Sequence, residues 1–275
     1  MKNKPSQFIS KDGIKLSIQT WTIDEPIAEL ILIHGSTEYT GRYIWAAKIF
    51  NENKINVHSF DLRGHGNSGG ERANITTFDE YIDDVHLFIE NLKLSNDKIF
   101  ILGHSLGGLI AMTYLTKYPD TKCRGVILSG PGLKMGDDIS PLLIKVISVL
   151  SALFPKLKTT KLNFQHLSRD PKVIEDAVND PLIYHEGIKA RLGGELIKAT
   201  IKLREHYSSF NFPALILYGS ADKLADPQGG QWMYDEISSE DKTLEILDGL
   251  YHEILHEPEK NEVIGKIIDW IKKRL

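Results

Sequence analysis

Short runs of apolar residues alternate along most of the chain with segments whose apolar positions recur every three or four residues. The runs have the length of buried strands, and the segments between them have the period of amphipathic helices. Strands that alternate with helices form mostly parallel sheets covered on both faces. The predicted strands are Glu29–Ile33, Ile55–Phe60, a strand that begins at Ile99, Gly125–Ser129, Ala214–Tyr218 and Thr243–Leu247, and the predicted helices are Tyr43–Glu52, Phe78–Leu92, one that ends near Tyr118, Gly230–Ile237 and Glu259–Lys273.

Two stretches depart from this alternation. Residues Phe8–Thr22 read as two strands around a turn at Lys11-Asp12-Gly13, which predicts an antiparallel hairpin at the sheet edge. Residues 133–210 are helical in pattern and contain no run of strand type. We therefore expect a helical cap, residues 133–210, inserted into a core formed by residues 1–132 and 211–275.

The predicted cap contains one conspicuously apolar stretch, Pro141–Phe154, in which Lys145 is the only charged residue. It is too short to span a bilayer. One interpretation is a helix buried between cap and core. The other is a lid that lines an apolar tunnel and touches a membrane surface with its outer face, and the same surface is equally compatible with a homodimer contact.

Composition narrows the class of protein. The 275 residues carry a formal charge of −4, which argues against a nucleic acid as the main partner. The single cysteine, Cys123, excludes an internal disulfide. No apolar segment follows the basic residues of the N-terminus, so we predict no signal peptide and a cytoplasmic protein, peripheral at membranes through the cap. No spacing of His and Cys suggests a metal or another cofactor.

The most informative motif is Gly103-x-Ser105-x-Gly107, which lies between a predicted strand and a predicted helix. This is the nucleophile-elbow pattern, in which a sharp strand-to-helix turn holds a serine on a strained backbone. The glycines leave room for the turn, and the start of the helix provides free N–H groups that favour developing negative charge. Ser105 is therefore the predicted nucleophile.

A serine nucleophile needs a base, and the base needs a group that orients it. In this architecture the acid and the histidine follow the serine in that order, at the ends of later strands. Asp222 follows Ala214–Tyr218, and His252 follows Thr243–Leu247, so all three side chains are expected at one sheet edge. Asp226 is the less favoured alternative acid. The predicted oxyanion donors are the backbone N–H groups of Ser36 and Leu106.

At this point the residues resemble the monoacylglycerol lipase family of α/β-hydrolases over nearly the whole chain. The resemblance rests on His34-Gly35-x-x-Glu38, Gly41-Arg42-Tyr43, Asp61-x-Arg63-Gly64-His65-Gly66-x-Ser68, Gly103-His104-Ser105-Leu106-Gly107-Gly108, Asp180-Pro181-Leu182, Gly219-x-Ala221-Asp222 and Tyr251-His252-Glu253. It implies an α/β-hydrolase fold with Ser105, Asp222 and His252 as the triad. It also implies that Glu38, Arg42 and His256 line a polar pocket for the glycerol hydroxyls. Many relatives have His where this chain has Tyr39.

The expected activity is therefore hydrolysis of monoacylglycerols through an acyl-enzyme on Ser105, without a cofactor. A lysophospholipase or a broad esterase would use the same triad on a different head group, and family members of that kind share almost the same motifs. A third hypothesis is a ligand-binding protein on a hydrolase scaffold. The intact triad and both oxyanion loops argue against it.

Overall fold

The computed structural model describes residues 2–3, 6–94, 98–134 and 140–275. The strands are β1 (Lys2–Asn3), β2 (Ser6–Ile9), β3 (Lys15–Thr22), β4 (Ala28–Ile33), β5 (Ile55–Phe60), β6 (Ile99–His104), β7 (Gly125–Ser129), β8 (Ala214–Gly219) and β9 (Lys242–Leu247). The α-helices are α1 (Ile44–Glu52), α2 (Asp79–Leu92), α3 (Leu106–Lys117), α4 (Pro141–Leu153), α5 (Pro171–Asn179), α6 (Ala190–Arg204), α7 (Gln228–Glu236) and α8 (Lys260–Lys272).

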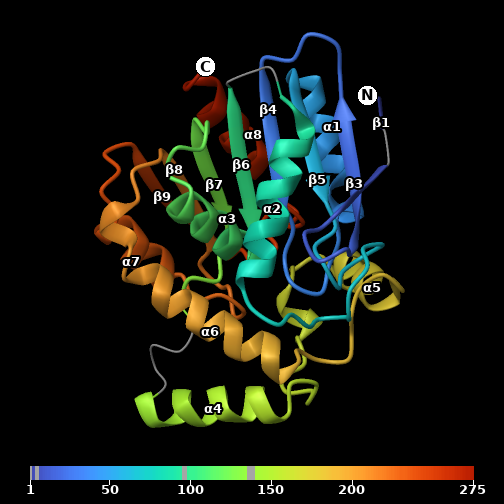
Figure 1. Ribbon diagram of the computed structural model, residues 1–275. Helices are drawn as coiled ribbons and strands as arrows, with labels where there is room; N and C mark the ends of the chain where they lie inside the picture. The colour runs from blue at the N-terminus through green and yellow to red at the C-terminus, as the bar shows by residue number, and fades with distance from the viewer. Residues whose placement is uncertain (1, 4–5, 95–97, 135–139) are drawn as a thin grey trace.

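The strands form a single sheet in the order β1-β3-β5-β4-β6-β7-β8-β9, with β2 also paired to β3. Strands β5, β4, β6, β7, β8 and β9 run parallel, and β3 joins them antiparallel to β5. The chain crosses from β5 over α2 to β6, which pairs directly with β4, for example Leu32 with Leu102. Strand β6 therefore lies inside the sheet, and the turn after it opens at the centre of the sheet edge (Figure 1).

Alternate residues of the strands pack on opposite faces of the sheet, as the period of a strand requires. Leu30 and Leu32 belong to the core cluster that includes the buried faces of α1 and α8. Ile31 and Ile33 belong to the cluster that includes α2, α3, α6 and α7. Because both faces are covered, the central strands are apolar throughout rather than alternating, which is the pattern that the sequence carries.

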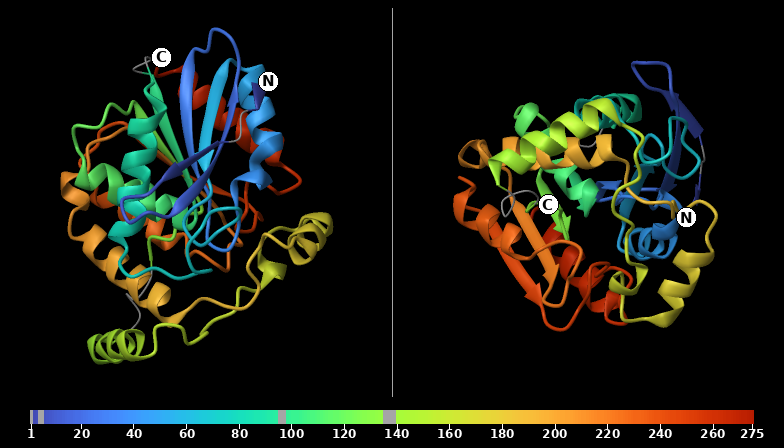
Figure 2. Two further views of the ribbon diagram at one scale, coloured as in Figure 1. Left: turned by 45° about the vertical axis from the view of Figure 1, so that its right-hand side comes forward. Right: turned by 90° about the horizontal axis from the view of Figure 1, so that it is seen from below.

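Helices α4, α5 and α6 lie between β7 and β8 in the chain, within the stretch predicted as a cap. Leu192 and Leu196 of α6 join the core cluster on the α3 side of the sheet. Helix α4 packs against α6 and lies outermost (Figures 1 and 2). Its outward side chains are exposed, including Leu142 at 73% and Leu153 at 67% of their surface.

The predicted elements agree with the structure within one or two residues at most ends. Tyr43 closes a short 3-10 helix, Thr40–Tyr43, and α1 starts after it at Ile44. Helix α7 begins two residues earlier than predicted, because the Asp226 carboxylate accepts a hydrogen bond from the N–H of Gln228 at 2.9 Å. Among the described residues, no helix is both long and apolar enough to cross a membrane. Both ends of the chain lie away from α4 (Figure 1).

Candidate active site

Ser105 occupies the turn between β6 and α3 with φ of 51° and ψ of −114°. A positive φ is unfavourable for a residue with a side chain and costs about 1–3 kcal/mol. The turn persists because its neighbours are glycines. A Cβ on Gly103 would lie 2.4 Å from the carbonyl oxygen of Gly107, and a Cβ on Gly107 would lie 2.0 Å from that of Ile33. The predicted elbow is therefore present, and its glycines are sterically required.

The structure brings His252 and Asp222 together. The two side chains follow β9 and β8, and His252 Nδ1 lies 2.7 Å from Asp222 Oδ2. The second carboxylate oxygen of Asp222 accepts hydrogen bonds from the N–H groups of Leu224 and Ala225 at 2.8 and 2.9 Å. These bonds fix the carboxylate, which in turn holds the imidazole with Nε2 as the nitrogen that can accept a proton.

The alternative acid, Asp226, is engaged elsewhere. One of its carboxylate oxygens pairs with Lys134 Nζ at 2.7 Å, and the other caps α7. Its side chain is about half exposed, whereas that of Asp222 is fully buried. Asp222 is therefore the carboxylate that orients the histidine.

The two predicted oxyanion donors flank Ser105. Leu106 is the first residue of α3, so its N–H has no partner within the helix. The loop after β4 is held by its own acid, because the N–H of Gly35 donates to Glu38 Oε1 at 2.6 Å. A Cβ on Gly35 would lie 3.3 Å from Cβ of Ser105, so this loop runs directly beside the nucleophile. Ser36 and Ser105 line the same cavity.

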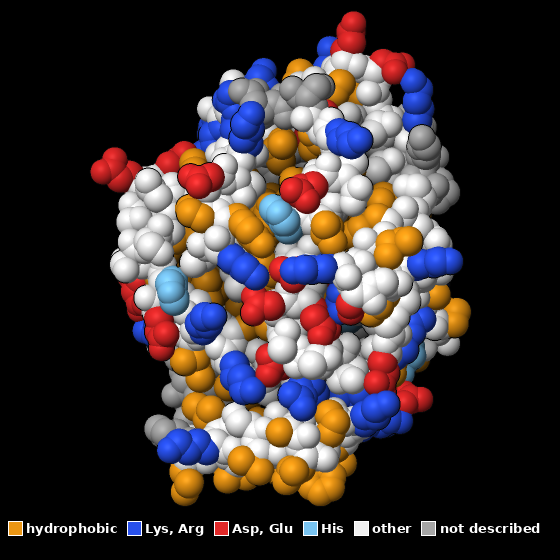
Figure 3. Space-filling view, in the orientation of Figure 1, with side chains coloured by type: hydrophobic (Ala, Val, Ile, Leu, Met, Phe, Trp, Pro, Cys, Tyr) orange, Lys and Arg blue, Asp and Glu red, His pale blue; other side chains and the backbone are white. Residues whose placement is uncertain are grey.

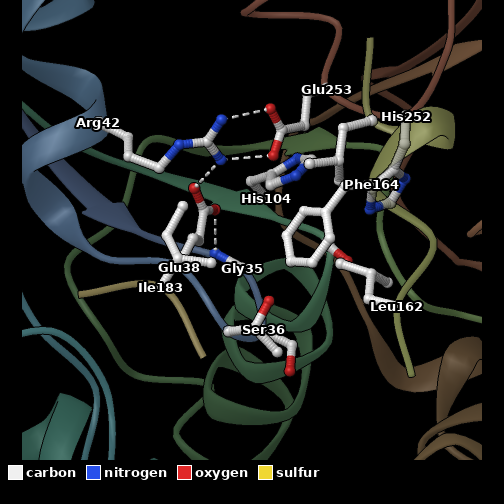
Figure 4. A pocket seen from close by; sticks show the side chains of 13 residues that line it. Gly35, Ser36, Glu38, Arg42, His104, Leu162, Phe164, Ile183, His252 and Glu253 are labelled. Carbon is white, nitrogen blue, oxygen red and sulfur yellow. Dashed lines mark hydrogen bonds and ion pairs between the residues drawn. The ribbon is translucent and has the colours of Figure 1, made fainter. Parts of the chain in front are cut away.

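The polar end of that cavity is built around one guanidinium. Arg42 Nη1 donates to Glu38 Oε2 at 3.0 Å and to Glu253 Oε1, and Nη2 donates to Glu253 Oε2 at 2.7 Å (Figure 4). Burial alone would raise the pKa of Glu253, but Arg42 outweighs it and holds that pKa well below its usual range. Burial alone would also raise the pKa of Glu38, but attraction to Arg42 and to other neighbouring groups together outweighs burial and lowers it. Both carboxylates are therefore ionised.

The apolar side of the cavity comes from the inserted segment. Four of its side chains line the cavity: Leu162, Phe164, Leu167 and Ile183. Leu162, Phe164 and Ile183 are labelled in Figure 4. The enclosed volume is about 40 Å³, which holds only a few water molecules. Pockets that hold drug-sized ligands measure roughly 300–1,000 Å³. The structure therefore represents a closed form of the site.

Two further histidines lie near the pocket in different settings. His104 lines the cavity, and burial lowers its pKa to about 4, so it is neutral at pH 7. His256, predicted to line the polar end, lies behind it. Its Nε2 is 3.1 Å from the carbonyl oxygen of Arg42, its ring packs edge-on against Tyr43, and it is not among the residues that line the cavity. Its Nδ1 also lies 3.6 Å from Oε2 of Glu253, which lines the cavity.

The sequence motifs predict neither the pairing of Glu253 nor the partner of Tyr39. In the sequence Glu253 belongs only to the Tyr251-His252-Glu253 motif, although it forms the bidentate pair with Arg42. Tyr39 Oη donates to Asp180 Oδ2 at 2.9 Å, which links the loop after β4 to α5. Within the described part of the chain, no group of three or more His, Cys, Asp or Glu side chains is arranged to hold a metal ion.

Comparison with known proteins identifies the family. The model of the serine aminopeptidase S33 family of hydrolases matches residues 24–259. The chain belongs to this family. It is therefore a serine hydrolase, and the α/β-hydrolase fold predicted from the motifs is confirmed.

Family members of known activity match over almost their full length. The monoacylglycerol lipase of Mycolicibacterium smegmatis is 31% identical over 98% of this chain and 96% of its own. Phospholipase YtpA of Bacillus subtilis is 32% identical over 89% of this chain and 95% of its own. The crystal structure of the monoacylglycerol lipase of Paleococcus ferrophilus superposes over the whole of both chains with a TM-score of 0.82 and 29% identity. The predicted resemblance to monoacylglycerol lipases is thereby confirmed.

Proposed function

We propose that this serine hydrolase cleaves monoacylglycerols into fatty acid and glycerol. The observation that carries the proposal is a single cavity in which Ser105 and His252 lie between a charged polar end and an apolar wall. A monoacylglycerol has the same division, with a neutral diol at one end and an apolar chain at the other. Several relatives that match over nearly their whole length are named monoacylglycerol or monoglyceride lipases.

In the proposed mechanism His252 Nε2 accepts the proton of Ser105 as its oxygen attacks the ester carbonyl. The N–H groups of Ser36 and Leu106 stabilise the oxyanion, and Asp222 stabilises the imidazolium. His252 then protonates the departing glycerol oxygen. A water molecule, deprotonated by His252, attacks the acyl-enzyme and releases the fatty acid by the same route in reverse.

The proposed glycerol site is the polar end formed by Glu38, Arg42 and Glu253. Glu38 Oε1 already accepts hydrogen bonds from Gly35 N and from Tyr43 Oη at 2.7 Å, so it also fixes the loop that carries Ser36. Remaining lone pairs on the two carboxylates can accept hydrogen bonds from hydroxyl groups. We assign His256 a supporting role, since it contacts the backbone of Arg42 rather than the cavity.

We further propose that residues 133–210 act as a lid on the core formed by residues 1–132 and 211–275. The closed cavity of about 40 Å³ has no room for an acyl chain, so Leu162, Phe164, Leu167 and Ile183 must move when substrate enters. The lid also carries the exposed apolar side of α4, which forms the lower surface of the molecule in Figure 3. Patches of this kind on a surface bind membranes or partner proteins.

The membrane is the occupant that we propose for α4, because the substrate itself resides in membranes and micelles. Replacing both Leu142 and Leu153 with Asp should abolish co-flotation with phosphatidylcholine vesicles. Ile9→Asp, at another exposed apolar side chain, should leave it unchanged. If the double variant instead keeps vesicle binding and converts a dimer into a monomer in light scattering, α4 is a homodimer contact.

The proposed activity is tested with three substrates of the same acyl length: a monoacylglycerol, a lysophosphatidylcholine and a p-nitrophenyl ester. Faster turnover of the monoacylglycerol than of the other two substrates would support the proposal, provided that Ser105→Ala abolishes this turnover. The relative named phospholipase YtpA makes a phospholipase the second candidate. Equal or faster turnover of the lysophospholipid would favour that candidate. If the protein hydrolyses none of the three esters, the remaining hypothesis is a ligand-binding protein.

A further inference from the structure

The guanidinium of Arg42 is more fully neutralised than the sequence suggested. Two buried carboxylates share it, Glu38 from the same loop and Glu253 from a loop 211 residues away. The side chain of Arg42 is 10% exposed, and those of Glu38 and Glu253 are 5% and 4% exposed. Solvent therefore screens these charges poorly, and their sum determines the potential in the cavity.

The neighbouring titratable groups are neutral at pH 7 and add no charge to that sum. Burial lowers the pKa of His104 to about 4 and lowers the pKa of His256, so both imidazoles are neutral at pH 7. Burial also raises the pKa of Tyr43 well above its ordinary value, so this phenol stays protonated and donates to Glu38. One guanidinium and two carboxylates give the polar end a formal charge of −1.

From this arrangement we propose that Glu253 is a specificity-determining residue that excludes substrates with a phosphate on the glycerol. The inference rests on the proposed function, since it concerns the head group bound at the same polar end. Glu253 accepts one N–H from each terminal nitrogen of Arg42, so the end-on pair of donors that a phosphate could use in bidentate fashion is already engaged. A phosphate would also approach two carboxylates of like charge, whereas a neutral diol meets no such repulsion.

The test compares two substrates with one acyl chain, decanoylglycerol and decanoyl-lysophosphatidic acid, below their critical micelle concentrations. The wild-type kcat/KM should be at least about a hundredfold higher for the neutral substrate, because desolvated like charges discriminate strongly. Glu253→Gln removes one negative charge and releases part of the guanidinium without changing the size of the side chain. It should raise the ratio of anionic to neutral kcat/KM by at least about tenfold.

The chain offers a matched control at its other buried arginine. Arg63 pairs with Asp12, Glu80 and Asp84 in a cluster that does not line the cavity. Asp12→Asn makes the same change in net charge and also deprives a buried guanidinium of one carboxylate. Its substrate ratio should equal that of the wild type, so a shift in this variant would mean that overall charge, rather than Glu253, sets the preference.

Two results would overturn the inference. One is a wild-type enzyme that hydrolyses both substrates equally, which needs no variant. The second is a folded Glu253→Gln with an unchanged ratio. Thermal melting and circular dichroism verify that each variant is folded.

Failure of the proposed function is recognised separately. If the wild type cleaves p-nitrophenyl butyrate but neither lipid, the monoacylglycerol assignment is wrong. The charge selection is then judged by competition against p-nitrophenyl butyrate. Glycerol 3-phosphate should inhibit Glu253→Gln at concentrations that leave the wild type and Asp12→Asn unaffected. Equal inhibition of all three proteins would refute the role of Glu253.

Discussion

Ser105 and Asp222 illustrate how single side chains acquire a role from the position of their strands. Ser105 lies on a backbone that only its glycine neighbours permit. Asp222 has one carboxylate oxygen on the histidine and the other on two backbone N–H groups, so its orientation is fixed on both sides. Neither residue can move without breaking contacts that belong to the end of a strand.

The first prediction concerns the choice between the two candidate acids. Asp222→Asn should lower kcat by on the order of 10³–10⁴-fold with little change in KM, because an amide no longer holds His252 in the tautomer that accepts the Ser105 proton. Asp226→Asn makes the same chemical change four residues later and should retain kcat within about twofold. Steady-state kinetics on a p-nitrophenyl ester decide between them, and equal losses would reject Asp222 as the orienting acid.

The second prediction contrasts two glycines. Gly107→Ala forces a Cβ to within 2.0 Å of a backbone oxygen, so it should destabilise the fold by more than about 3 kcal/mol or prevent folding. Gly265 lies inside α8 with nothing within 4 Å of a Cβ position. Gly265→Ala should raise the free energy of unfolding by about 0.5–1 kcal/mol, through helix propensity alone. Urea denaturation measures both, and similar effects would contradict the steric argument.

The sequence was sufficient to predict the positions of side chains that depend on local context. Ser105, Asp222 and His252 each follow a recognisable strand, and parallel strands bring such positions to one edge. The pairing of Arg42 with Glu253 could not be predicted in the same way, because it depends on how two distant loops meet. The position of His256 also depends on how these loops meet. The family resemblance implies that His256 lines the cavity, whereas in the structure its ring packs against Tyr43.

At the scale of elements, hydrogen bonds attach the inserted segment to the loops of the site. Tyr39 Oη donates to Asp180, Tyr184 N donates to the carbonyl oxygen of Thr37 at 3.0 Å, and Glu253 N donates to that of Leu167 at 2.8 Å. These bonds connect the closing residues directly to the loops that carry Ser36 and His252. They therefore oppose the opening that we propose for substrate entry.

A third prediction follows for Tyr39, the residue that departs from the pattern of many relatives. Tyr39→Phe removes one side-chain hydrogen bond between lid and core, which contributes about 1 kcal/mol. The kcat/KM for a long-chain ester should rise about two- to fivefold, with no change for p-nitrophenyl acetate, which needs no opening. Tyr81→Phe is the control, because the buried Tyr81 hydroxyl has no hydrogen-bond partner among the described residues. A parallel change on both esters would rule out a lid effect.

The boundaries of the elements could be predicted from the sequence in the core but not in residues 133–210. The strands and helices of the core were predicted almost to the residue because burial on both faces leaves continuous apolar runs. Inside residues 133–210 the prediction reached only a helical character. The start of α5 depends on Asp170, which accepts a hydrogen bond from Lys172 N at 2.9 Å, and on Pro171 as the first helical residue. Residues that can cap a helix are visible in the sequence. The sequence does not show which of them begins a helix and which forms a turn.

The molecule as a whole buries several imidazoles in neutral form. Burial lowers the pKa of His65 to about 3 and that of His104 to about 4. The unfolded chain protonates both near the ordinary histidine pKa of about 6.5. Below that pH the unfolded state binds more protons than the native state, so the free energy of unfolding falls as the pH falls.

The fourth prediction concerns how far the free energy of unfolding falls as the pH falls. Between pH 7.5 and pH 5 each of these two histidines should reduce the free energy of unfolding by on the order of 2 kcal/mol. Urea denaturation at several pH values measures the loss. His65→Asn should show a shallower pH dependence than the wild type, because one of the titrating groups is gone. An identical slope in the two proteins would exclude His65 as a contributor.

The position of the chain ends has a practical consequence. Both ends of the chain lie at the end of the molecule away from α4 (Figure 1). A protein anchored to a bead or a sensor chip through either end would therefore present α4, the surface that we propose to contact lipid, outward in a uniform orientation. Random coupling through lysines would bury that surface in a fraction of the molecules. End-anchored protein is thus the appropriate format for measuring interfacial kinetics on supported monolayers.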